Sequence, residues 1–158
     1  MTAMNRQVLL ASRPQGPVTV DNFRIVDAPI GAPGEGEVLV KNEWLSLDPY
    51  MRGRMNDVKS YVPPVQIGEV MVGQTVGEVV ASRDSRFATG DKVLAPSGWQ
   101  LYGVVRADEV YKIDARRAAA SYYLGVLGMP EMTAWFGLFD IGAPKPGENF
   151  GKQLVKLA

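Results

Sequence analysis

The chain has 158 residues, of which 46% are hydrophobic and 22% are charged, and its 17 basic and 17 acidic side chains give a formal net charge of +0. These values are typical of a globular protein. The balanced charge excludes a basic surface for nucleic acid or an anionic membrane.

The chain contains no cysteine and no histidine. This excludes disulfides, cysteine nucleophiles, Ser-His-Asp triads and zinc sites built from thiolate or imidazole ligands. A magnesium or calcium site built from carboxylates alone stays open, but the sequence has no EF-hand spacing, so we expect no metal site. No stretch approaches the roughly 20 apolar residues that cross a bilayer. Together with the lack of cysteine, this predicts a cytoplasmic protein without a membrane partner.

Short strand-forming runs follow one another up to about residue 113. Gly- and Pro-rich turns separate them, and the runs are residues 6–11, 18–26, 37–47, 70–82, 92–95, 99–106 and 110–113. Many short strands at this spacing predict a small β-barrel or sandwich. Gly73 and Gly77, inside one of these strands, indicate a bulge or a close approach of two backbones.

The third predicted strand ends at Asp48-Pro49, which is a helix-start signal. The Asp48 carboxylate can accept from free backbone N–H groups, and proline is tolerated at the first helical position. We therefore expect Asp48 to cap a short helix or turn that presents Tyr50 at the end of a strand. The alternative is a corner in which Tyr50 only packs. Arg52 and Arg54 are interpreted as solvated surface charges, the alternative being that they attract a phosphate or a carboxylate.

The pattern changes to a helical one after residue 113. Residues 114–127 are rich in alanine and leucine, and a second helix is predicted from Met129-Pro130 to Gly142. In this helix an apolar face follows i, i+3, i+4, i+7 spacing, formed by Met132, Trp135, Phe136 and Phe139. The last residues, 149–158, contain a short predicted strand.

Several motifs in order resemble one known family. The runs are Leu45-Ser-Leu-Asp-Pro-Tyr-Met-Arg52, Gly98-Trp-Gln100, Leu124-Gly-Val-Leu-Gly-Met-Pro130 and Met132-Thr-Ala-Trp-Phe-Gly-Leu138. They are similar to the zinc-independent medium-chain dehydrogenases/reductases, and most similar to the group of prostaglandin reductases and plant double-bond reductases. Residues 148–157 resemble the C-terminus of that group.

The resemblance implies a mainly β fold with a few helices, namely a GroES-like, partly open β-barrel that forms the catalytic and substrate domain over residues 1–148. Residues 149–158 would pack back on the barrel as a strand. In the family a second, Rossmann domain binds NADPH. Here Pro144-Lys-Pro-Gly-Glu148 runs directly into the C-terminal signature, and no Gly-x-Gly-x-x-Gly is present. Ten residues cannot form a βαβ unit of roughly 30, so we expect the Rossmann domain to be missing.

The resemblance also implies site residues. Tyr50 would be the catalytic residue, donating a hydrogen bond to the substrate carbonyl as enolate charge develops. Tyr61 and Met132 would line the substrate site, and Thr133 and Asn149 would contact the cofactor. The alternatives are packing for the tyrosines and Met132, and a turn for Asn149.

The predicted function is that of the substrate-binding domain of an NADPH-dependent oxidoreductase that reduces the C=C bond of α,β-unsaturated carbonyl compounds. Without its nucleotide-binding domain we expect the chain to bind no NADP(H) and to be inactive alone, so whether it acts as an enzyme stays open. A second reading is a non-catalytic scaffold that forms homo-oligomers through Trp135, Phe136 and Phe139. A third is an enzyme that works with a separate nucleotide-binding partner.

Overall fold

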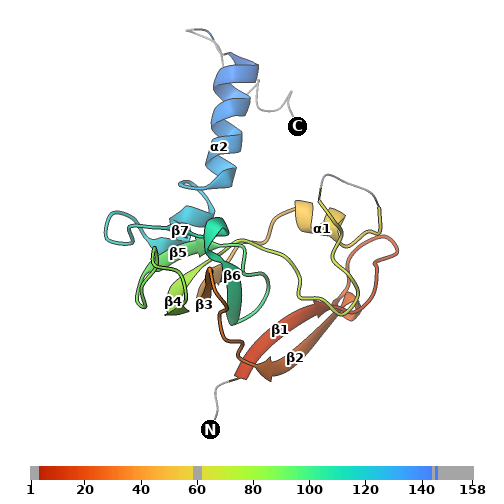
Figure 1. The fold of residues 1–158 in the computed structure, drawn as a ribbon. Coiled ribbons are helices and arrows are strands. Elements are labelled where there is room, and N and C mark those ends of the chain that lie inside the picture. Colours follow the sequence, from red (N-terminus) through yellow and green to blue (C-terminus); the bar gives the residue numbers. More distant parts are fainter. Residues whose placement is uncertain (1–3, 59–61, 144, 146–158) are drawn as a thin grey trace.

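A computed structural model describes residues 4–58, 62–143 and 145 of the chain. Within this part the fold is mainly β with a few helices, which confirms the predicted fold class (Figure 1). The strands are β1 (Met4–Leu10), β2 (Phe23–Pro29), β3 (Glu37–Leu45), β4 (Thr75–Ser82), β5 (Lys92–Ala95), β6 (Tyr102–Arg106) and β7 (Tyr111–Lys112).

The helical elements are short. Two are α-helices, α1 (Tyr50–Arg54) and α2 (Met129–Phe136). Three are 3-10 turns, η1 (Val20–Asn22), η2 (Ala107–Glu109) and η3 (Ala120–Leu124), and α2 continues as the π-helical segment η4 (Gly137–Gly142). The predicted end of this helix at Gly142 is confirmed.

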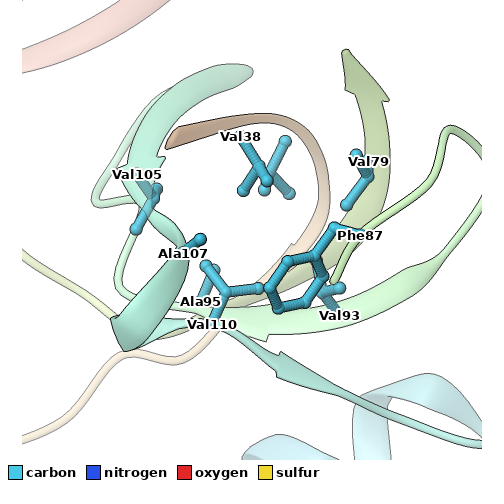
Figure 2. Close-up of a cluster of buried hydrophobic side chains, with 9 residues drawn as sticks. Val38, Val79, Phe87, Val93, Ala95, Val105, Ala107 and Val110 are labelled. Atoms are coloured by element: carbon cyan, nitrogen blue, oxygen red, sulfur yellow. The ribbon is translucent and has the colours of Figure 1, made fainter. Parts of the chain in front are cut away.

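Five antiparallel strands form one sheet in the order β6-β3-β4-β5-β7, so β6 and β7 are its two edges. Alternate side chains point to the inner face because strand residues alternate sides. Val38 and Val40 on β3 are fully buried in this way. Figure 2 shows the strands passing around the cluster, which also contains Val79, Phe87, Val93, Ala95, Val105, Ala107 and Val110.

Strands β1 and β2 form a separate antiparallel ribbon that is tied to the rest by β1. The Val8 N–H donates to the Trp99 carbonyl at 2.9 Å, and the Met71 N–H donates to the Val8 carbonyl at 3.0 Å. A second buried cluster lies under this ribbon and consists of Leu10, Met55, Val65 and Met71, with Phe23, Val72 and Trp99 packed against it. Met55 directly follows α1, so this cluster also anchors that helix.

Gly77 marks a close approach between β3 and β4, as predicted. A Cβ atom at this position would lie 2.2 Å from the Lys41 carbonyl oxygen. The ladder also shifts here, because Asn42 pairs with Gly77 while Trp44 pairs with Val76. The bulge is therefore on β3, opposite the glycine.

Two predicted strands begin five residues later than expected, at Phe23 and Thr75, and β6 begins at Tyr102 rather than at residue 99. Residues 18–22 are not extended, because the Asn22 side chain folds them into η1: its Oδ1 accepts from the Thr19 N–H at 2.9 Å. Residues 70–74 do not extend β4, because they bond elsewhere. The Gly98 N–H donates to the Gly73 carbonyl, and the Trp99 N–H donates to the Met71 carbonyl.

The helix predicted over residues 114–127 is wrong in extent, since only Ala120–Leu124 is helical, as a 3-10 turn. The chain turns too tightly afterwards for a helix to continue: a Cβ at Gly128 would lie 2.3 Å from the Tyr123 carbonyl oxygen. The domain boundary expected at residue 148 and the strand expected in 149–158 lie outside the described residues.

The α2–η4 helix stands away from the sheets (Figure 1). Its predicted apolar face is uncovered: Met132, Trp135, Phe136 and Phe139 are 46–55% exposed. Trp135 packs on Phe136 and Phe139 at ring-centroid distances of 5.3 and 5.4 Å. In the described part of the chain, no helix has the length and apolar character that a membrane span requires.

Candidate functional site

The site begins where β3 ends. Its last residue is Leu45, and after four intervening residues the chain enters α1, with Tyr50 as the first helical residue as predicted. The expected capping role of Asp48 is wrong. Its carboxylate accepts from the Ser46 hydroxyl at 3.0 Å, while its main-chain carbonyl accepts from the Met51 N–H at 3.1 Å. Backbone bonds, rather than a side-chain cap, therefore start the helix.

Tyr50 is half-buried and lines a pocket of about 240 Å³ at one side of α1. The other lining residues come from α1 and from the segments on either side of the next loop, and they are Gly53, Arg54, Asn56, Val58, Val62 and Pro64. The lining is apolar except for Tyr50, Asn56 and Arg54. Tyr61, predicted to shape the substrate site, lies outside the described residues.

Two arginines hold α1 in place. The Arg13 guanidinium donates to the carbonyl oxygens of Met55 at 2.7 Å and Val65 at 3.0 Å. The Arg52 guanidinium donates to Asn56 Oδ1 at 2.6 Å and to the Gly16 carbonyl at 2.9 Å. The interpretation of Arg52 as a solvated charge is therefore wrong, and sequence reasoning did not find Arg13.

A second, more apolar pocket lies on another side of α1. It has a volume of about 280 Å³ and is lined by Val18, Phe23, Leu47, Asp48, Pro49, Met51, Arg52, Met55, Met71 and Trp99. The Phe23 and Trp99 rings stack at 5.4 Å with an interplanar angle of 21°. This pocket shares α1 with the Tyr50 pocket but contains fewer groups that could orient a polar ligand.

The two predicted residues on α2 lie apart from Tyr50. Met132 is exposed, and the exposed Thr133 donates its hydroxyl hydrogen to the Met129 carbonyl at 2.9 Å within the helix. The N-terminal end of α2 lies near the segment that follows β3. A small pocket of about 70 Å³ there includes Ser46, Asp48, Met129 and Pro130. Asn149, the other predicted cofactor contact, lies outside the described residues.

Shifted pKa values occur in surface ion pairs away from α1. The Arg86 guanidinium and its backbone N–H lower the pKa of Asp84 to about 2. The carboxylates of Glu43 and Glu78 raise the pKa of Lys92. These pairs hold turns and strand ends. Among residues 4–58, 62–143 and 145, no three His, Cys, Asp or Glu side chains are grouped to bind a metal ion.

Comparisons with known proteins place these features in context. Residues 6–113 match the family described as the N-terminal domain of oxidoreductase. The chain is 52% identical over 145 residues to the NADPH-dependent curcumin reductase of Escherichia coli, an alignment covering 92% of this chain and 42% of that protein. It is 37% identical over 150 residues to the 2-alkenal reductase (NADP(+)-dependent) of Nicotiana tabacum, an alignment that covers 92% of this chain and 44% of that protein.

A solved structure shows the same fold. CurA from Vibrio vulnificus, crystallised in complex with NADPH, superposes with a TM-score of 0.84 at 50% identity and covers 90% of this chain and 42% of that chain. The chain thus spans less than half the length of the relatives it matches.

Proposed function

Because the chain belongs to the zinc-independent medium-chain dehydrogenases/reductases, in the branch of prostaglandin and double-bond reductases, we propose that it binds the substrate of an NADPH-dependent reductase. The reaction would be reduction of the C=C bond of α,β-unsaturated carbonyl compounds.

The position of Tyr50 carries this proposal. The side chain lines the 240 Å³ pocket beside the apolar groups of Val58, Val62 and Pro64. A phenol can donate a hydrogen bond to a carbonyl oxygen, and such a bond strengthens as enolate charge develops on that oxygen. The apolar side chains suit the hydrocarbon part of an enone. Tyr50 is therefore the proposed catalytic residue.

NADP(H) is the cofactor of the family and supplies the hydride when it is bound. That this chain binds no NADP(H) by itself stays a prediction. Thr133, the one predicted cofactor contact that the structure describes, lies on an exposed helix and already donates to Met129. The contribution of this chain is to hold and orient the carbonyl group.

The isolated chain should therefore have negligible reductase activity. Hydride transfer requires the nicotinamide and the alkene carbon to be held together, and this effect is lost when no domain holds the donor. The measurement is NADPH oxidation by the purified chain with benzylideneacetone, a neutral enone. Turnover above the background without protein would contradict this expectation.

A chimera tests the proposed function directly. In it, this chain replaces the matching region of the E. coli curcumin reductase, with which it shares 52% identity. The folded chimera should oxidise NADPH with benzylideneacetone, and Tyr50→Phe should lower kcat about 100-fold, the usual cost of removing one oxyanion donor.

The matched control is Tyr111→Phe, which removes the same hydroxyl group from a tyrosine that is 66% exposed on β7. A folded chimera without enone reduction would overturn the proposed function. Equal kcat values for the Tyr50→Phe and Tyr111→Phe variants would contradict the proposed catalytic role of Tyr50.

A second candidate function is a non-catalytic scaffold, favoured by the uncovered apolar face of α2–η4. An apolar patch of this kind promotes association with another protein surface. The proposed partner is a second copy of the chain, which makes a homo-oligomer the expected state. A cytoplasmic location remains a prediction.

A further inference from the structure

Arg54 differs from the other two arginines near α1. Its side chain is half-buried at the end of the helix, and its Nε is fully buried without a hydrogen-bond partner. Within the described part of the chain its guanidinium has no ion pair or hydrogen bond. Arg13 and Arg52, by contrast, each donate to two oxygen atoms.

An arginine in this position is energetically unfavourable. The guanidinium keeps its charge at every accessible pH. The buried Nε–H has lost its hydrogen bond to water, a cost that an acceptor in the pocket would recover, and the two terminal nitrogens of the guanidinium are not buried and stay within reach of a ligand. Since no described side chain supplies it, an external acceptor fits here.

The lining of the pocket indicates which kind of acceptor would bind Arg54. Arg54 lines the same 240 Å³ pocket as Tyr50, and among the described lining residues there is no carboxylate that could neutralise the arginine. Its remaining wall is mainly apolar, with Val58, Val62 and Pro64. The planar fork of a guanidinium matches a carboxylate, with which it forms two parallel hydrogen bonds.

We propose that the Tyr50 pocket binds small carbonyl compounds that carry a carboxylate, and that Arg54 binds the carboxylate and sets this preference. Tyr50 would bind the carbonyl oxygen of the same molecule. The volume is slightly below the roughly 300–1,000 Å³ of drug-sized sites, which restricts the ligand to a short one. The statement that this ligand is also the substrate rests on the proposed function. The statement that the pocket binds such a ligand is independent of that function.

The test is calorimetric titration of the chain as it exists. The probes are 3-benzoylpropionate, a keto acid without a reactive double bond, and its neutral methyl ester. The acid should bind at least tenfold more tightly than the ester. Arg54→Gln should abolish this difference, and Arg54→Lys, which keeps the positive charge, should restore part of it.

The matched control is Arg24→Gln, which makes the same change at an exposed arginine on β2. Circular dichroism verifies that each variant is folded. The proposal is overturned if acid and ester bind equally, if neither binds, or if Arg24→Gln weakens acid binding as much as Arg54→Gln. It is also overturned if inorganic phosphate displaces the acid at equal concentration, since the site would then be a general anion site. The acid–ester comparison on the unmodified chain decides the matter even if Arg54→Gln does not fold.

The chimera separates this proposal from the proposed function. Arg54-dependent binding of the keto acid together with a chimera inactive on enones would leave the carboxylate site standing and overturn the reductase function. If the chimera reduces benzylideneacetone but the chain binds the keto acid no more tightly than its ester, the reductase function would stand and the carboxylate site would be overturned.

Discussion

Arg13 and Arg52 join the same two segments in opposite directions. Arg13 follows β1 and reaches across to the carbonyl oxygens of Met55 and Val65, just after α1 and the loop beyond it. Arg52 lies on α1 and reaches back to the carbonyl oxygen of Gly16. Helix α1, which carries Tyr50, is therefore held against the segment after β1 by charged hydrogen bonds in both directions.

Removing Arg13 should destabilise the fold more than its position in a loop suggests. Its side chain is only 20% exposed. Arg13→Met leaves two carbonyl groups without their donor, and we expect the free energy of unfolding to fall by about 2–3 kcal/mol. Urea denaturation measures this value. The control Arg83→Met breaks only an exposed pair with Glu35 and should cost less than about 0.5 kcal/mol. Equal losses of unfolding free energy in the two variants would show that the Arg13 hydrogen bonds do not stabilise the fold as expected.

Replacing glycine by alanine should have opposite effects on the stability of the fold at Gly77 and at Gly53. Gly77→Ala would place Cβ 2.2 Å from the Lys41 carbonyl oxygen and 2.9 Å from Val40 Cγ1. Because backbone must move, we expect a loss of about 3 kcal/mol or failure to fold. Gly53→Ala meets nothing within 4 Å inside α1 and should stabilise by about 0.5–1 kcal/mol. Thermal unfolding compares the two, and a tolerated Gly77→Ala would contradict the close approach.

The turn after β4 should give the fold a pH dependence in acid. The pKa of Asp84 is lowered from 3.8 to about 2, first by the Arg86 side chain and then by its N–H. A lowered folded-state pKa contributes stability that is complete above the unfolded value of 3.8 and is lost as the pH falls through about 2.

Asp84→Asn should therefore destabilise the protein at pH 7 and flatten the fall in melting temperature between about pH 4 and 2. Although the Asp84 side chain is only 14% exposed, its partner Arg86 is 59% exposed, so the effect should be small and should shrink in high salt. The melting temperatures of both proteins, measured across this range, provide the comparison. Parallel curves would show that Asp84 does not contribute the expected linkage.

The features that the sequence predicted correctly depend on local signals. The strand-forming run before Asp48-Pro49 sufficed to place Tyr50 at the start of a helix, and a glycine inside a strand marked the contact at Gly77. The spacing of apolar residues identified the exposed face of α2.

The features that it missed depend on contacts distant in sequence. Arg13 binds carbonyl groups 42 and 52 residues away, and a carbonyl group is present at every residue, so no side-chain pattern points to it. That Arg54 finds no partner among the described residues likewise depends on which residues surround the pocket. Asp48 had a capping sequence, but the Ser46 hydroxyl occupies its carboxylate.

The uncovered face of α2–η4 leads to the last prediction, that the chain self-associates. Trp135, Phe136 and Phe139 are each about half exposed, and the Trp135 ring packs on both phenylalanine rings. Burying this group against a second copy gains apolar contact area. Sedimentation velocity at increasing concentration should show dimers or larger species, and Trp135→Glu should shift them to monomer by placing a charge in the patch. The control is Val20→Glu, which adds the same charge at a residue that is 84% exposed elsewhere. A wild-type chain that stays monomeric at high concentration would rule out this face as a homo-oligomer interface.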